Sequence, residues 1–174
     1  MAIANKYETL LFAKIETTKG VDAAPTPAAD AIRVRSFKIK KVTSAIDRPS
    51  MKQTMGNLPH LIGKETLQLD VEFELRGSGT AGTAGEASPL LQACRLSETV
   101  AVGVSVTYKP SSATASEKSA TIWAYYDGLL YKMVGAVGTG KVDAQIDGIL
   151  LFTGTFQSAY AAPTVVAVSS VTGM

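Results

Sequence analysis

The stretch RGSGTAGTAGEAS, residues 76–88, has glycines at 77, 79 and 82, the Gly-x-Gly-x-x-Gly spacing with which some folds hold a dinucleotide. That chemistry needs a buried parallel strand before the glycines and a helix that opens directly after them. Here the preceding run alternates apolar and polar residues, and a helix pattern starts only at Ser88. We therefore interpret this loop as a flexible connection and not as a nucleotide site.

Three carboxylates at period two, Asp70, Glu72 and Glu74, are the next candidates for chemistry. A catalytic carboxylate pair normally comes from separate elements that converge on a cleft. These three instead share one face of one strand. We expect that face to meet solvent or a partner, and pairing with Arg33 and Arg35 on an adjacent strand is the alternative.

The cations, the thiol and the imidazole form no catalytic or metal-binding pattern. We expect the single cysteine, Cys94, to pack on the apolar face of a short helix, and the single His60 leaves little for metal binding. Seven cations within twenty residues form a possible nucleic-acid patch: Arg33, Arg35, Lys38, Lys40, Lys41, Arg48 and Lys52. Only Phe37 is interleaved as an aromatic platform, and the acidic strand would neutralise the cations across a ladder or a subunit boundary. We predict no enzyme, no cofactor and no metal.

The elements that must position these residues are mostly strands. In residues 66–75 an apolar set alternates with polar residues, as in an antiparallel strand with one solvated face: Leu67, Leu69, Val71, Phe73 and Leu75. Residues 99–109 show a similar pattern, and Asp127-Gly128 is typical of a tight hairpin. The one credible helix begins at Ser88, which we expect to cap it. These patterns predict a mainly β fold, a sandwich or barrel with one short α-helix and extended terminal arms.

Composition favours a single domain that meets partners. The chain has 174 residues, of which 46% are hydrophobic and 18% charged, below the roughly 25% charged of an average globular chain. A net charge of +2 gives no strong field toward nucleic acid or membrane. The uncharged residues 148–174 are interrupted by Gly154, Gln157 and Pro163, so we expect no membrane insertion. We find no convincing signal peptide at the N-terminus.

Two apolar segments suggest self-assembly. Residues 49–63 interrupt the β pattern with a long loop that is unusually apolar, through Met51, Met55, Leu58, Leu61 and Ile62. Long loops are usually functional or disordered, and exposed apolar area marks partner contact. Residues 161–174 form a β-prone, uncharged C-terminal arm that invites pairing with another chain. We expect the loop to become ordered only against neighbouring subunits or rings.

The order and spacing of these segments resembles the major tail tube proteins of tailed bacteriophages. The resemblance covers most of the chain and is carried by ETLLFAKIETTKGVDAAPTPAADAIRV, RPSMKQTMGNLPHLIGKETLQLDVEFEL, GSGTAGTAGEASPLLQACRLSETV, YYDGLLYKMVGAVGT and FTGTFQSAYAAPT. It implies one tail-tube domain over residues 1–174, whose copies form hexameric rings that stack into the conduit for genomic DNA. It also implies tape-measure, terminator and tail-tip proteins as partners, and a place in the virion tail after assembly in the host bacterial cytoplasm.

A DNA conduit should not hold its cargo, so its walls should be acidic or neutral. We therefore predict that Asp70, Glu72 and Glu74 face the lumen and that DNA passes without sequence-specific binding. The alternatives are another tail ring component, a terminator or adaptor that stops at one ring, or a carbohydrate-binding β-sandwich module. The latter would need an aromatic binding platform, which the sequence does not indicate.

Overall fold

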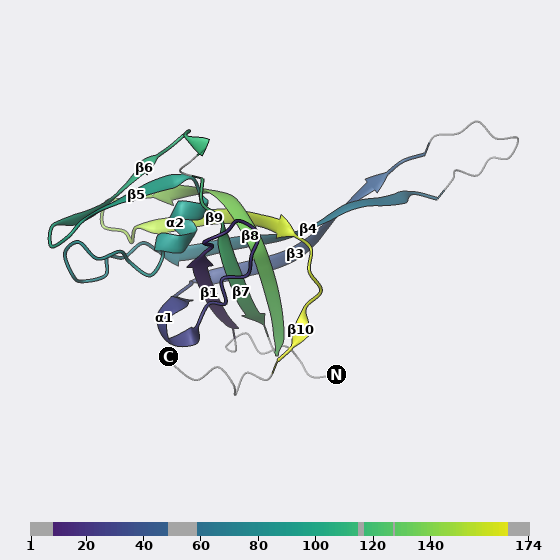
Figure 1. The fold of residues 1–174 in the computed structure, drawn as a ribbon, viewed down its shortest axis with the longest axis horizontal. Coiled ribbons are helices and arrows are strands. Elements are labelled where there is room, and N and C mark those ends of the chain that lie inside the picture. Colours follow the sequence, from purple (N-terminus) through teal and green to yellow (C-terminus); the bar gives the residue numbers. More distant parts are fainter. Residues whose placement is uncertain (1–8, 49–58, 115–116, 127, 167–174) are drawn as a thin grey trace, which may run out of the picture.

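The computed structural model describes residues 9–48, 59–114, 117–126 and 128–166. Most of the described chain is strand, and the predicted mainly β fold is confirmed (Figure 1). The strands are β1 (Thr9–Ile15), β2 (Ala31–Ile32), β3 (Ser36–Ile46), β4 (Leu61–Glu74), β5 (Leu96–Ala101), β6 (Ser105–Pro110), β7 (Ala120–Tyr126), β8 (Leu129–Asp143), β9 (Leu151–Ala159) and β10 (Thr164–Val165). The helices are α1 (Pro27–Asp30) and α2 (Ser88–Ala93).

The long strand β8 joins two layers of one antiparallel sheet, whose order is β2-β1-β7-β8-β9-β4-β3. Its first part, through Ala136, pairs with β7, and its second part, from Val137, pairs with β9. At the junction Val134 and Gly135 oppose the single residue Thr121 of β7, a bulge that lets the strand turn from one layer into the other. The hairpin of β5 and β6 forms a separate two-stranded sheet.

The layers enclose one main apolar core. Leu67, Leu69, Val71 and Phe73 of β4 all point into it and are at most 2% exposed, as their alternation predicts. The ring of Phe73 stacks on Phe152 of β9 at a centroid distance of 4.9 Å. Helix α2 adds its own apolar face to this core and contacts β1, β5, β7 and β8.

Strand β8 makes room for two aromatic rings by having no side chains beneath them. The Phe152 ring lies over Gly140, and the Phe156 ring lies over Gly138, so a Cβ atom at either glycine would overlap the ring above it. Gly154 of β9 is in the same position between the two rings. The second layer therefore depends on glycines that the sequence analysis did not single out.

One turn agrees with the sequence-based expectation and one differs from it. The hairpin at residues 127–128 is confirmed, since Tyr126 and Leu129 face each other across it. Residues 99–109 are not one strand, because the chain reverses at Val102–Val104 and Gly103 takes a φ of +71°. Asp147-Gly148 lies in a longer connection, residues 144–150, between β8 and β9.

The helices also differ from expectation. A second short helix, α1, precedes β2, so the described chain has two helices where one was predicted. Ser88 does not cap α2: Ala87 is the N-cap residue and makes no side-chain capping bond, while the Ser88 hydroxyl donates to Glu98. Pro89 stands in the first turn of α2. No helix in the described ranges is long and apolar enough to cross a membrane.

Candidate functional site

The outer face of the β3-β4-β9-β8 layer is polar and carries the three carboxylates singled out in the sequence. Asp70, Glu72 and Glu74 alternate with the core residues of β4 and are each partly exposed. Their neighbours across the ladder on β9 are Thr155 opposite Asp70 and Thr153 opposite Glu72. The strand therefore has one face in the core and one polar face, as the alternation indicated.

Asp70 is the most firmly held of the three. Its Oδ1 accepts hydrogen bonds from Gln68 Nε2 at 2.8 Å and Thr155 Oγ1 at 2.9 Å, and its Oδ2 lies 3.1 Å from Lys40 Nζ. The bond from Gln68 lowers the pKa of Asp70, and Lys40 and Thr155 add to this against the effect of partial burial. Asp70 therefore stays ionised and pre-paired, which makes it unsuited to proton transfer.

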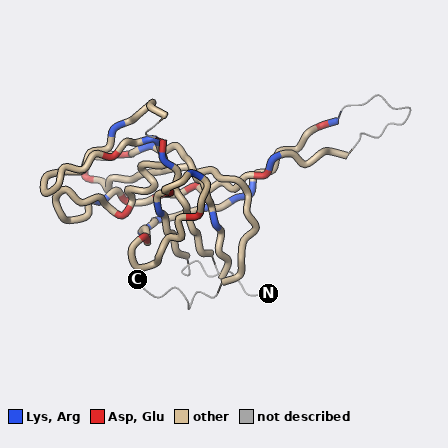
Figure 2. The backbone as a smooth tube through the Cα atoms, viewed as in Figure 1, with Lys and Arg blue, Asp and Glu red and all other residues tan. Residues whose placement is uncertain are grey.

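Several cations of the basic cluster are paired with acidic side chains, which is the alternative that the sequence left open. Arg35 lies 3.5 Å from Glu72, and Lys41 lies 2.7 Å from Glu65. Arg33 pairs with Glu86 and not with the β4 carboxylates, and Glu74 pairs with Arg76 two residues along the chain. Figure 2 shows the two signs interspersed over the body of the molecule.

The glycine loop is built as a packed connection. Ser78 Oγ donates to the carbonyl oxygens of Thr80 and Thr83 at 2.9 and 2.8 Å, which fixes the loop's shape. Gly82 has a φ of +69°, and a Cβ there would overlap the backbone of Ala101 and Gly103 in the β5–β6 turn. The strand before the loop is antiparallel to both its neighbours. The arrangement is not a nucleotide fingerprint, but the loop is more ordered than a flexible connection.

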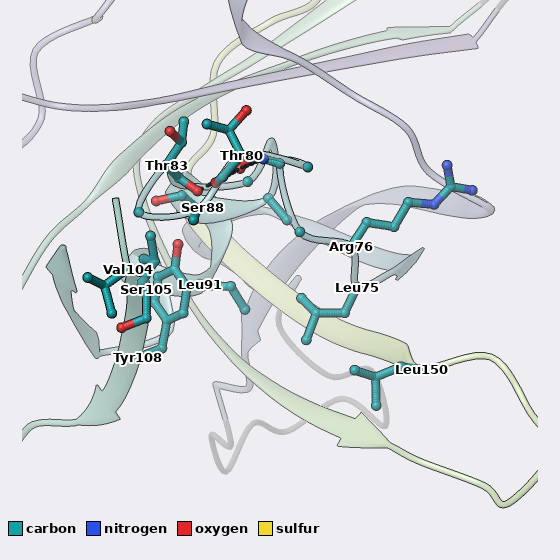
Figure 3. Close-up of a pocket in the computed structure, with 18 residues that line it drawn as sticks. Leu75, Arg76, Thr80, Thr83, Ser88, Leu91, Val104, Ser105, Tyr108 and Leu150 are labelled. Carbon is teal, nitrogen blue, oxygen red and sulfur yellow. Dashed lines mark hydrogen bonds between the residues drawn. The ribbon is translucent and has the colours of Figure 1, made fainter. Parts of the chain in front are cut away.

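A cavity of about 430 Å³ lies between this loop and the β5–β6 hairpin (Figure 3). Apolar side chains from four segments line it: Leu75, Leu91, Val104, Val106 and Leu150. On its hairpin side Tyr108 donates to Glu98 at 2.6 Å, and Ser88 of α2 donates to the same carboxylate oxygen. Burial, together with the bond to Glu98, raises the pKa of Tyr108 to about 12. The bond from Ser88 connects the hairpin to α2.

The remaining candidates for chemistry have structural positions. Burial raises the pKa of the Cys94 thiol to about 12, so it packs at the end of α2 as predicted and is not an activated nucleophile. His60 and Asp47 form an exposed pair at 2.5 Å. Within the described ranges, no group of three His, Cys, Asp or Glu side chains is placed to hold a metal.

The predicted assembly loop extends from a long arm. Strands β3 and β4 continue well beyond the body as a two-stranded ribbon (Figure 1). Leu61 and Ile62 belong to β4, so part of the segment predicted as a loop is strand, and they are 50% and 75% exposed. Met51, Met55 and Leu58 lie outside the described residues.

The described part of the C-terminal arm finds a strand within its own chain. Thr164 and Val165 pair with Leu130 and Leu129 of β8. The expectation that this arm lacks a partner strand therefore does not hold for these residues. Residues 167–174 of the arm lie outside the described residues.

The feature that sequence reasoning missed is a pair of unpaired strand edges. Within the described chain, β3 ends the sheet on one side, and residues 137–143 of β8 have a strand partner only in β9. Both edges belong to the layer that carries the β4 carboxylates. Edge strands often carry lysines, as β3 does, but which strand forms an edge is known only from the strand order.

Comparison with known proteins gives a family. A family model described as phage tail tube protein matches residues 7–174, and curated protein sequences give no match. A chain in the structure of the virion of the native gene transfer agent particle superposes with a TM-score of 0.55 at 9% identity, covering 94% of this chain and 98% of that one. A chain in the baseplate of the anti-feeding prophage gives 0.55 at 11% identity, covering 97% and 98%. At such low identity the likeness shows the fold alone.

Proposed function

This chain belongs to the phage tail tube protein family, and we propose that its copies close into hexameric rings which stack into a DNA conduit. It is a structural protein of the virion tail. The observation that carries the ring is the four-stranded layer β3-β4-β9-β8 with its two free edges. The number six rests on the resemblance described above.

The strand directions favour a ring. Each strand in this layer is antiparallel to the next, so β3 and the second part of β8 run in opposite directions. Two copies placed side by side in the same orientation would therefore join β8 of one to β3 of the next as an antiparallel pair. A contact between two different patches that repeats with one rotation closes into a ring when the angle permits.

The bulk of the subunit decides which face would line the lumen. The other layer and α2 stand on the core side of the four-stranded layer. Because a ring has more space at its outside than near its axis, the larger part of each subunit would lie on the outside. The polar face with Asp70, Glu72 and Glu74 would then point inward, which supports the prediction made from the sequence.

The charge on this face suits a passage for DNA. Its strand positions carry three lysines, Lys38, Lys40 and Lys141, and four carboxylates, Asp70, Glu72, Glu74 and Asp143. Two of these lysines are also paired, Lys40 with Asp70 and Lys141 with Asp143. These ion pairs weaken the attraction of the lysines for DNA phosphates. The face would neither bind DNA tightly nor read its sequence.

Cysteine labelling tests the lumen assignment. Glu72→Cys should react with a small maleimide in subunits and tubes alike, but with a bulky polymer-linked maleimide only in subunits, since the lumen would exclude it. Lys19→Cys, on the segment after β1, is the comparison and should stay accessible to the bulky reagent. Equal bulky labelling of Glu72→Cys in subunits and tubes would place the face outside.

Stacking would use the arm and the predicted loop. The exposed apolar residues Leu61 and Ile62 on the arm support this role, which we extend to Met51, Met55 and Leu58. Replacing Met55, Leu58 and Leu61 together with serine should leave the unfolding of the monomer nearly unchanged and abolish tubes. If the monomer unfolds, these side chains belong to the subunit core.

Electron microscopy of the purified protein tests the whole proposal. Hollow tubes of varying length are expected, assembled from further copies of this chain alone. Single rings that never stack would favour a terminator or adaptor, and monomers at all concentrations would contradict ring formation. Tape-measure, terminator and tail-tip proteins would complete the tail after assembly in the host cytoplasm.

A further inference from the structure

The two ends of the long axis differ in a way that suggests how rings contact each other. The strands of the β3-β4-β9-β8 layer run along this axis, and the arm leaves the body at one end (Figure 1). The glycine loop, the β5–β6 turn and the 144–150 connection lie at the opposite end. If copies join edge to edge, the ring axis runs roughly along the strands, so these ends face opposite sides of the ring.

The arm carries an apolar surface that its own chain leaves uncovered. Strand β4 has a bulge at Gly63 and Lys64, opposite Ser44 of β3, and Leu61 lies beyond it on the arm. Its cross-strand partner on β3 is Ile46, and these two side chains are 50% and 51% exposed. An exposed apolar pair of this kind is typical of a surface that another chain covers.

The opposite end offers a matching surface. Residues 77–85 and 99–108, which form the glycine loop and most of the β5–β6 hairpin, contain no charged residue, and both segments are tan in Figure 2. The cavity between them has a mostly apolar lining, which includes Val104. Val104 is 74% exposed, and Val102 in the adjoining β5–β6 turn is 89% exposed. Its volume of about 430 Å³ lies in the range that holds a drug-sized ligand, so two branched aliphatic side chains fit.

We propose that the cavity between the glycine loop and the β5–β6 hairpin is the acceptor for the Leu61–Ile46 face of an arm from a copy in the next ring. This inference rests on the proposed stacking. The contact would join two different surfaces of the subunit, the arm on one side of the ring and the cavity on the other. Because they differ, the contact is head-to-tail and leaves both ends of a stack open for further rings.

Single charged substitutions at exposed positions test each surface. Val104→Asp and Leu61→Lys should fold as the parent does, with unchanged unfolding temperatures, because both side chains are at least half exposed. Each should still form rings but require about tenfold more protein, or more, to form tubes. Val21→Asp is the matched control, since Val21 is 58% exposed on the segment after β1, and its tubes should be normal.

Charge pairing then tests direct contact. The double variant with Val104→Asp and Leu61→Lys should recover tubes, because the two new charges meet across the ring boundary. Normal tubes from Val104→Asp alone, or failure of the double variant to recover, would overturn the acceptor assignment. Loss of rings as well as tubes in Val104→Asp would also overturn it, because the hairpin would then be a contact within the ring. Absence of rings in the parent protein would instead refute the proposed function.

Discussion

At the scale of single residues, the most consequential side chain is a buried carboxylate that the sequence does not mark. Glu16 is 5% exposed at the end of β1. Its two oxygens accept four hydrogen bonds: Gly20 N at 2.7 Å, Ser119 Oγ at 2.6 Å, Thr121 Oγ1 at 2.8 Å and Gly135 N at 2.6 Å. It therefore ties together β1, the start of β7, the β8 bulge and the turn at residue 20.

Replacing Glu16 by glutamine should destabilise the subunit strongly. Each carboxylate oxygen faces two donors, whereas glutamine would turn an NH₂ group toward one of these pairs. We expect Glu16→Gln to lower the free energy of unfolding by about 2–4 kcal/mol, measured by urea denaturation of the monomer. Glu74→Gln is the control, because Glu74 is partly exposed at the surface and pairs with Arg76, and it should unfold like the parent. Equal stability of all three proteins would show that the Glu16 cluster is not formed in solution.

The same carboxylate should make stability depend on pH. Burial raises the pKa of Glu16, but the four hydrogen bonds together lower it more, so it lies below the ordinary value in the folded state. The unfolded chain then takes up the proton first, and the stabilisation is complete above about pH 4.5 and lost as the pH falls through the folded-state pKa. The stability difference between the parent and Glu16→Gln should shrink below about pH 4.5. A difference that stays constant down to pH 3 would contradict this.

At the scale of elements, the sequence was informative where a local pattern determines the structure. The alternation of β4 predicted its core and polar faces, and Asp127-Gly128 predicted the β7–β8 turn. It was misleading at 99–109, because a regular alternation of valines does not show that Gly103 reverses the chain. It also placed Ser88 as a cap, although the Ser88 hydroxyl donates its hydrogen bond to Glu98, ten residues later. Partners that distant in the chain leave no local signal.

The glycines under the aromatic rings give an element-scale prediction. Gly140 lies beneath Phe152, whose ring is stacked on Phe73, so an added methyl group would force two rings to move. We expect Gly140→Ala to lower the free energy of unfolding by about 1–3 kcal/mol through overpacking. Gly77→Ala is the matched control, because nothing lies within 4 Å of a Cβ there. Thermal unfolding of both variants checks this. Equal melting temperatures would show that the layer accommodates a methyl group at residue 140 without strain.

At the scale of the whole molecule, the candidate surfaces depend on strand order, which a sequence does not contain. The carboxylates of β4 and the apolar residues near Leu61 are visible as residue types. The free edges of β3 and β8, and the placement of the arm and the cavity at opposite ends, become visible only once distant strands have paired. Local sequence patterns thus identified most of the residues that would take part in assembly, but not how the fold arranges them in space.

Backbone protection gives a direct measure of that geometry. In the free subunit, half of the amide groups along β3 and along residues 137–143 of β8 have no strand partner, whereas residues 66–72 of β4 and residues 151–157 of β9 are paired on both sides. If rings form by joining these edges, amide exchange along both should slow by about tenfold or more on assembly, because each gains a ladder of hydrogen bonds. Exchange in residues 66–72 of β4 and in residues 151–157 of β9 should change little, which makes them internal controls. Hydrogen–deuterium exchange with mass spectrometry, comparing monomers with tubes, resolves these segments. Protection gained by only one edge, or by neither, would show that the ring contact runs through side chains elsewhere on the subunit.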